Sequence, residues 1–207
     1  MTCTLPCSAC PASWARRWKR SLVEVPYLSP DAGLAERWKK EVGADEGFKV
    51  GIVWQGNPQH RRDRHRSVPL RLFAPLARLP GVRLFSLQKS VGVEQLKTLA
   101  EPFPIADLGS RLDETAGAFT DTAAVLKNLD LVITVDTAAA HLAGALAVPV
   151  WTILSSAPDW RWLLHRADSP WYPTMRLFRQ TEPGDWDAVF RRIEDELTKL
   201  VARTAPA

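Results

Sequence analysis

Hydrophobic and polar positions along this chain switch repeatedly between two patterns. From Phe48 onward, short apolar runs rich in β-branched residues alternate with segments whose apolar residues recur at helical spacing. A short apolar run bounded by turn residues is typical of a buried strand, and helical spacing is typical of a helix with one buried face. Strands are predicted at 48–54, 82–88, 105–108, 131–135, 149–154 and 175–179. Their alternation with helices predicts an α/β fold with a doubly wound parallel sheet.

The segments between these strands predict helices at 67–79, 93–100, 113–128 and 137–147, and a last amphipathic helix begins at Trp186. Asp185 is expected to cap this last helix. Pro75 must lie in the first turn of its helix, because a proline further along would break it. The residues expected to share one face of 113–128 are Ala116, Phe119, Ala123 and Leu126.

The first 46 residues have no such pattern. Prolines interrupt them, basic residues cluster at 16–20, and no sustained period emerges. A short helix is expected from about Pro30 to Val42, with Asp31 near its start and Gly43 after its end. We therefore divide the chain into an irregular, partly helical lead-in segment, 1–46, and one domain, 47–207.

Composition limits the possible classes of protein. The chain has 207 residues, of which 46% are hydrophobic, enough for a core, and a net charge of +4, which favours anionic ligands but is too small to indicate a nucleic-acid-binding protein. No apolar run reaches the length of a membrane span, and no secretory signal is evident, so we expect a cytoplasmic protein. Cys3, Cys7 and Cys10 have the spacing of a radical S-adenosylmethionine iron–sulfur motif. Nothing strand-like precedes them and no histidine lies nearby, so we interpret them as free thiols.

Polar residues follow four of the predicted strands. They are Gln55–Asn57, Gln88–Lys89, Asp107–Gly109 and Asp136–Thr137. Because parallel strands end on one side of a sheet, all four groups are expected to face one crevice, where ligands of such sheets bind.

The most informative of these junctions is the one at Asp136, where an apolar strand passes directly into an alanine-rich helix. A helix that begins there directs free N–H groups and a positive dipole end into the crevice, which suits an anionic group. The alternative is that Asp136 or Thr137 only caps the helix. His141, one turn further on, could bind a ribose hydroxyl or be a structural histidine.

Two loops add candidate contacts. The loop 60–66 holds four arginines and one aspartate, which suits phosphate recognition, although a solvated surface loop is the alternative. Trp160, Trp162 and Trp171 could stack on a base or sugar, or plug the side of the domain, and we expect two of the three to plug it. The chain has no P-loop, G-x-S-x-G, H-E-x-x-H or G-x-G-x-x-G motif, which argues against kinases, hydrolases and nicotinamide dehydrogenases.

Five segments, taken in order, resemble the carboxyl-terminal domain of GT-B glycosyltransferases. They are KVGIVWQGNPQHRRDRHRSVPL, FSLQKS, DLG, FTDTAAVLKNLDLVITVDTAAAHLAGALAVPVW and APDWRWLLHRADSPWYPTMRLFRQ. The similarity runs from about residue 47 to about residue 200. It is to bacterial tetratricopeptide-repeat proteins with a family-nine, heptosyltransferase-like domain, and more distantly to O-linked N-acetylglucosamine transferases.

This resemblance implies the Rossmann-like half of a GT-B fold that binds a nucleotide-diphosphate sugar. Asp136, Thr137 and Ala138 would meet the diphosphate or sugar, and His141 would lie near the ribose. The remaining implied contacts are Asn57 with His60 or Arg61 at the phosphates, Gln88 and Lys89 lining the cleft, and the backbone around Leu108 at the base edge. The resemblance implies no metal or other cofactor, and it assigns no catalytic residue.

The resemblance is incomplete at the amino-terminal side. In the family a first Rossmann-like domain holds the acceptor, a protein or a glycan, and residues 1–46 cannot form it. We therefore expect a truncated transferase that binds its donor but is inactive in isolation. The alternatives are a non-catalytic module that binds nucleotides or a partner, and an RNA-binding protein that uses the arginine loop and the tryptophans.

Overall fold

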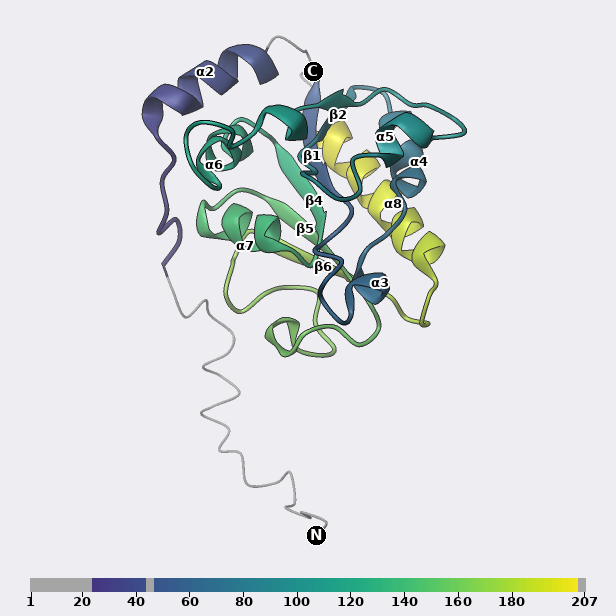
Figure 1. The fold of residues 1–207 in the computed structure, drawn as a ribbon. Coiled ribbons are helices and arrows are strands. Elements are labelled where there is room, and N and C mark those ends of the chain that lie inside the picture. The colour runs from purple at the N-terminus through teal and green to yellow at the C-terminus, as the bar shows by residue number, and fades with distance from the viewer. Residues whose placement is uncertain (1–23, 44–46, 205–207) are drawn as a thin grey trace.

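The structure is a computed structural model, which describes residues 24–43 and 47–204 (Figure 1). The cysteine cluster at Cys3, Cys7 and Cys10 and the basic cluster at 16–20 lie outside the described residues. Among the described residues, no helix combines the length and apolar character that crossing a membrane requires.

Six parallel strands form the central sheet. They are β1 (Phe48–Val53), β2 (Val82–Ser86), β3 (Ala106–Asp107), β4 (Leu131–Val135), β5 (Val150–Leu154) and β6 (Met175–Arg179). Their order is β3-β2-β1-β4-β5-β6, so the chain moves outward from β1 to β3 and then returns to the centre as β4. The predicted doubly wound α/β fold is confirmed, and its topological switch point lies between β1 and β4, which end side by side with Val53 opposite Thr134.

Helices cover both faces of the sheet (Figure 1). One face carries α2 (Ala32–Val42), α6 (Thr120–Leu126) and α7 (Ala138–Ala145), and the other carries η2 (Leu70–Phe73), α4 (Ala74–Ala77), α5 (Gln95–Thr98) and α8 (Trp186–Thr204). Three further short helices lie in loops: α3 (Asp63–Arg66), η3 (Gly109–Arg111) and η4 (Trp160–Trp162). Two apolar clusters, one on each face, form the core.

Helix α2 belongs to this core, although it precedes the first strand. Asp31, expected near the start of this helix, caps it by accepting a hydrogen bond from the backbone N–H of Leu34 at 2.8 Å. Trp38 is fully buried against α6, and its indole N–H donates to Asp121 Oδ1 at 2.7 Å. A helix that buries a tryptophan in this way packs onto the domain that follows it.

Helix α6 corrects one sequence-based prediction. Residues 113–119 are not helical, because Asp113, Gly117 and Phe119 adopt positive φ values of 56°, 92° and 63°. The carboxylate of Asp113 instead accepts hydrogen bonds from the backbone N–H and hydroxyl of Thr122, which fixes the loop against the first turn of the helix. Ala116 and Phe119 therefore do not share the buried helix face, and Phe119 is 50% exposed.

Two further predictions differ in extent. The helix expected over 67–79 is shorter, a 3-10 turn followed by α4, with Pro75 in the first turn of α4 as expected. The loop expected over 60–66 contains the helical turn α3. Asp185 caps α8 as predicted, since its carboxylate accepts from the backbone N–H of Ala188 at 3.0 Å.

Candidate functional site

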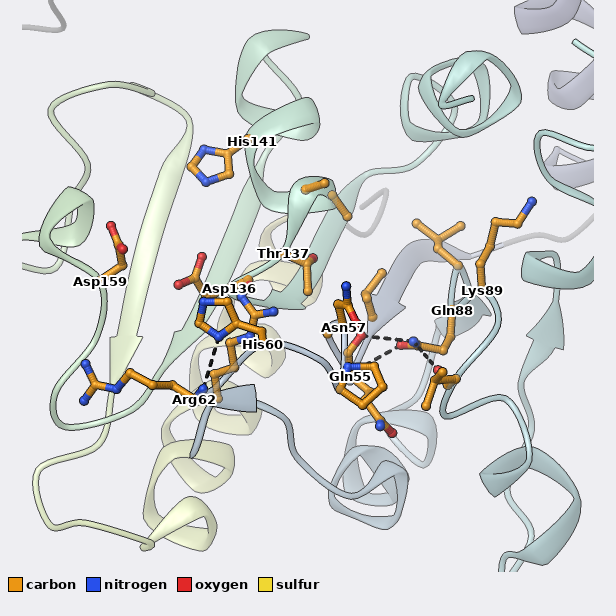
Figure 2. A pocket seen from close by; sticks show the side chains of 18 of the residues that line it. Gln55, Asn57, His60, Arg62, Gln88, Lys89, Asp136, Thr137, His141 and Asp159 are labelled. Carbon is orange, nitrogen blue, oxygen red and sulfur yellow. Dashed lines mark hydrogen bonds between the residues drawn. The ribbon is translucent and has the colours of Figure 1, made fainter. Parts of the chain in front are cut away.

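A cavity of about 840 Å³ opens at the carboxyl ends of the central strands. Figure 2 shows Gln55, Asn57 and Gln88 on one side and Asp136, His141 and Asp159 on the other, with Thr137 between them. These residues follow β1, β2, β4 and β5, so the cavity lies over the switch point of the sheet. Its volume is within the range of about 300 to 1,000 Å³ that is typical of small-molecule sites.

Helix α7 begins at the wall of this cavity and is not capped by a side chain. Its first residues, Ala138 and Ala139, line the cavity, and their backbone N–H groups have no partner among the described residues. The hydroxyl of Thr137 lies 3.1 Å from that of Thr134 rather than on the helix. The interpretation of Asp136 or Thr137 as only a helix cap is therefore wrong, and the positive end of the helix is open toward the cavity.

A buried ion pair holds the loop after β1 against this helix end. Arg66 donates to Asp63 Oδ1 at 3.1 Å and to the backbone carbonyl of Asp136 at 2.8 Å. Asp63 is only 5% exposed. Gly56 lies directly against this pair, because a Cβ at this position would be 2.6 Å from both the Arg66 guanidinium and the Asp63 carboxylate and would displace them. The ion pair thus fixes the distance between the basic loop and the β4–α7 junction.

Gln88 lines the cavity, but its amide is used within the protein. Its carbonyl oxygen accepts from the backbone N–H groups of Trp54 and Gln55, at 3.1 and 3.0 Å. Its amide donates to the carbonyls of Gln55 and Val91, at 3.0 and 2.8 Å. Both amide protons and both carbonyl lone pairs are engaged, so Gln88 holds the loops after β1 and β2 together.

Only some of the phosphate contacts predicted for the basic loop line the cavity. Asn57 and His60 line the cavity, and the imidazole Nδ1 of His60 accepts from the backbone N–H of Arg62 at 3.3 Å (Figure 2). Arg61 does not line this cavity but a second depression on the other side of the loop. Arg62 takes its place, and its guanidinium has no ion-pair partner among the described residues. The composition of the loop indicated a basic contact without showing which arginine faces the ligand.

His141 is held by two aromatic side chains. Its Nδ1 lies 3.2 Å from the hydroxyl of Tyr172, and its ring stacks on Trp162 with a centroid separation of 5.1 Å and an interplanar angle of 22°. Burial has the largest effect and lowers the pKa of His141. The nearby Asp136 raises this pKa by a smaller amount, and Arg161 lowers it. A neutral imidazole at the cavity wall can donate through one nitrogen and accept through the other.

The tryptophans behave largely as predicted. Trp162 is fully buried beneath His141, Trp171 is half-buried, and Trp160 is 67% exposed. Two of the three therefore close the side of the domain. Only Trp160 presents a free aromatic face, partly covered by the guanidinium of Arg161 at 5.1 Å.

Lys89 lines the cavity, whereas Leu108 does not. The Lys89 ammonium donates to the carbonyl of Leu112 and lies 3.2 Å from Glu114, and Figure 2 shows it pointing away from the centre of the cavity. Leu108 lies outside the cavity, and its backbone N–H and carbonyl are bonded to Ser86 and Arg111. The expectation that its backbone faces the ligand is corrected, because the end of β3 packs behind Gln88 instead.

In the loop after β5, sequence reasoning considered the tryptophans but missed two charged residues. Asp159 and Arg161 line the cavity and form an ion pair at 2.8 Å. Burial alone would raise the pKa of Asp159, but hydrogen bonds from the backbone and side chain of Arg161 lower it overall. The rule that parallel strands end at one edge, applied to β5 as well, would have found this pair.

No cluster of three or more histidine, cysteine, aspartate or glutamate side chains that could hold a metal ion occurs within 24–43 and 47–204. The cavity wall instead combines single carboxylates with arginine and histidine side chains, as at Asp136, Arg62 and His60.

Comparison with known proteins gives one family match and one curated relative of similar sequence. The model of glycosyltransferase family 9 (heptosyltransferase) matches residues 78–183. Protein FlbA of Caulobacter vibrioides is 27% identical over 177 residues, which are 85% of this chain and 29% of FlbA. The chain therefore spans less than a third of that relative.

Solved structures share the fold at low sequence identity. E. coli ADP-heptose LPS heptosyltransferase II superimposes with a TM-score of 0.59 at 16% identity, over 87% of this chain and 56% of that one. The family 9 glycosyl transferase of Veillonella parvula gives 0.54 at 13% identity, over 86% and 52%. E. coli WaaC with ADP-2-deoxy-2-fluoro heptose gives 0.52 at 18% identity, over 86% and 51%. The chain spans about half the length of these structures and matches their carboxyl-terminal half.

The matched family segment runs from the residues before β2 to the residues after β6, so it contains the β4–α7 junction and most of the cavity wall. This chain belongs to glycosyltransferase family 9, the heptosyltransferase family, and has the fold of one half of a GT-B enzyme.

Proposed function

We propose that the cavity binds a nucleotide-diphosphate sugar, the donor of a glycosyl transfer. One observation carries the proposal: the unpartnered N–H groups of Ala138 and Ala139 open into a cavity at the switch point of the sheet, opposite a basic loop. Helix N-termini of this kind bind phosphate groups through their N–H donors and dipole. ADP-sugars are the first candidates, because the WaaC structure holds an ADP-sugar analogue.

Charge divides the cavity into two parts. We place the diphosphate between the start of α7 and Arg62, which line the same cavity and supply N–H donors and positive charge. The carboxylate of Asp136 can only accept hydrogen bonds, so it suits hydroxyl groups of the sugar or ribose rather than phosphate. We thus assign Thr137 and Ala138 to the diphosphate and Asp136 to a hydroxyl.

The base is assigned to the side of the cavity formed by the segments after β2 and β3. Val91 and Phe119 line this side and are 40% and 50% exposed, so they offer apolar surface to a planar ring. This assignment replaces the base contact expected at Leu108. It leaves the identity of the base to experiment.

The same arrangement would assist transfer. When the sugar leaves, negative charge develops on the diphosphate, and the N–H groups of α7 with Arg62 are placed to offset it. The chain spans about half the length of the solved relatives. We therefore propose the transfer reaction, its acceptor and an association with tetratricopeptide repeats only for a larger protein or complex that contains this domain.

Isothermal titration calorimetry of the chain with ADP-, UDP- and GDP-sugars and with a short single-stranded RNA tests the proposal. We expect one nucleotide class to bind at one site with a shallow dependence on salt, because one diphosphate replaces few counterions. RNA binding with a steep dependence on salt, and no nucleotide-sugar binding, would favour the RNA-binding alternative and contradict the proposal.

A further inference from the structure

The only two tyrosines of the chain lie next to each other behind the cavity. They are Tyr172, after η4, and Tyr27, in the segment before α2. The backbone N–H groups of Tyr27 and Leu28 donate to the carbonyl of Ala145 at 3.1 and 3.3 Å, at the end of α7. This segment therefore crosses the end of the helix that carries His141.

The tyrosine ring reaches His141 because α7 has a glycine at the point of contact. A Cβ on Gly144 would lie 2.4 Å from the Tyr172 ring, closer than real atoms approach. Gly144 is one turn after His141, so the Tyr172 ring lies along the helix and its hydroxyl reaches the imidazole Nδ1, 3.2 Å away. Tyr172 is itself only 8% exposed.

The two hydroxyls can form a chain of hydrogen bonds in which Tyr27 donates to Tyr172 and Tyr172 donates to His141. Burial raises the pKa of Tyr172, so its phenol keeps its proton, and the Tyr27 hydroxyl lies within hydrogen-bond reach of it. Tyr27 is 50% exposed and can donate its own proton to the Tyr172 oxygen, which leaves the Tyr172 proton for His141. The charged groups that face His141 are Asp136 after β4 and Asp159 and Arg161 after β5.

We propose that Tyr172 is a positioning residue that donates its hydroxyl hydrogen bond to Nδ1 of His141 and thereby keeps the imidazole proton on Nε2. The nitrogen that remains for a ligand is then an N–H donor, which suits a phosphate or ribose oxygen, whereas a bare lone pair there would repel a phosphate. Tyr27 supports this arrangement from the other side. The role in ligand binding rests on the proposed function, but the tautomer is a property of the protein alone.

NMR spectra that correlate each imidazole nitrogen with its ring protons report the tautomer in the ligand-free protein. His141→Gln identifies the signal among the four histidines. We expect His141 to carry its proton on Nε2 in the wild type, and Tyr172→Phe, which keeps the ring beside Gly144, to give a mixture of both tautomers. A proton on Nδ1 in the wild type, or an unchanged tautomer in Tyr172→Phe, would overturn the inference.

Tyr27→Phe is the matched control, because it removes a hydroxyl from the same network without removing the bond to His141. We expect it to shift the tautomer less than Tyr172→Phe does.

Calorimetry with ADP gives the second readout. Tyr172→Phe should weaken ADP binding about fivefold, which corresponds to the loss of one hydrogen bond. If ADP and ADP-sugars fail to bind the wild type while the tautomer changes as expected, the donor-binding proposal fails and the positioning role stands. If the variant does not fold, the wild-type spectrum alone decides.

Discussion

At the scale of single residues, Arg66 is the side chain on which the shape of the site depends most. It lies beneath Gly56, pairs with the buried carboxylate of Asp63 and holds the backbone carbonyl of Asp136. The sequence offered Asp63 only as one acidic residue in a basic loop. Its burial could not be predicted, because it depends on contacts between segments 70 residues apart.

Removing Arg66 leaves Asp63 buried without its partner, so we expect Arg66→Met to lower the free energy of unfolding by about 3 kcal/mol. The double variant Asp63→Leu with Arg66→Met removes both charges and should be less destabilised than Arg66→Met alone. Urea unfolding of the three proteins measures this. If the single and the double variant had the same free energy of unfolding, the unpaired charge of Asp63 would not be the cause of the destabilisation.

His141 gives the stability of the protein a dependence on pH. Burial lowers its folded pKa below the value of 6.5 that it has when unfolded, so the unfolded state binds the proton more readily. The free energy of unfolding should therefore fall as the pH drops from about 7.5 through 6.5, and the fall should stop below the folded pKa.

In His141→Gln this part of the pH dependence should be absent, since glutamine does not titrate. Chemical unfolding of both proteins between about pH 7.5 and pH 5.5 measures the difference. His60→Gln, a substitution at an exposed histidine, is the control and should keep the wild-type slope. A wild-type slope in His141→Gln would assign the effect to other groups.

At the scale of elements, the junction of β4 and α7 could be predicted from the sequence almost completely. The apolar run 131–135, the following carboxylate and the alanine-rich segment gave the strand, the turn and the helix within two residues of their observed limits. The start of α6 could not be predicted, because the carboxylate of Asp121 accepts both from the distant Trp38 indole and from the backbone N–H of Asp113. A carboxylate held by tertiary contacts overrides the local preference for helix.

Because no side chain caps the start of α7, substitutions there should change ligand affinity without changing the stability of the fold. Neither Asp136 nor Thr137 caps the helix with its side chain, so Asp136→Ala with Thr137→Val should change the melting temperature little. Donor affinity should fall at least about tenfold, since two hydrogen-bonding groups leave the site.

Asp31→Ala is the matched control, because Asp31 does cap a helix, α2. It should lower the free energy of unfolding by about 1 kcal/mol and leave donor affinity unchanged. Calorimetry and thermal unfolding of both variants make the comparison. A large loss of stability with unchanged affinity in the double variant would mean that the two side chains support the fold and not the ligand.

At the scale of the whole molecule, the site is a consequence of strand order. Residues after β1, β2, β4 and β5 meet because the chain leaves the centre of the sheet and returns to it, with β1 and β4 adjacent. The sequence predicted the junctions after β1, β2 and β4 at the cavity and also placed Asp107–Gly109 there, whereas the chain after β3 reaches the cavity only further along, at residues such as Phe119 and Thr122. The outward distance of β3 in the sheet explains this difference.

The overall architecture also bears on the activity expected of the isolated chain. The residues that the structure describes form a single sheet with its covering helices, and the cavity lies at the edge of that sheet. We expect the isolated chain to bind donor without transferring the sugar, as measured by release of nucleoside diphosphate in the presence of candidate acceptors. Turnover by the isolated chain would refute this expectation.

The central claim is that the start of α7 receives the diphosphate of a nucleotide sugar. Titration of the isotope-labelled protein with ADP, followed by NMR of the backbone amides, tests it most directly. The account predicts that the largest saturable shifts occur at Ala138 and Ala139, the two unpartnered N–H groups at the cavity wall. Binding that leaves both amides unchanged, with shifts elsewhere on the surface, would contradict it.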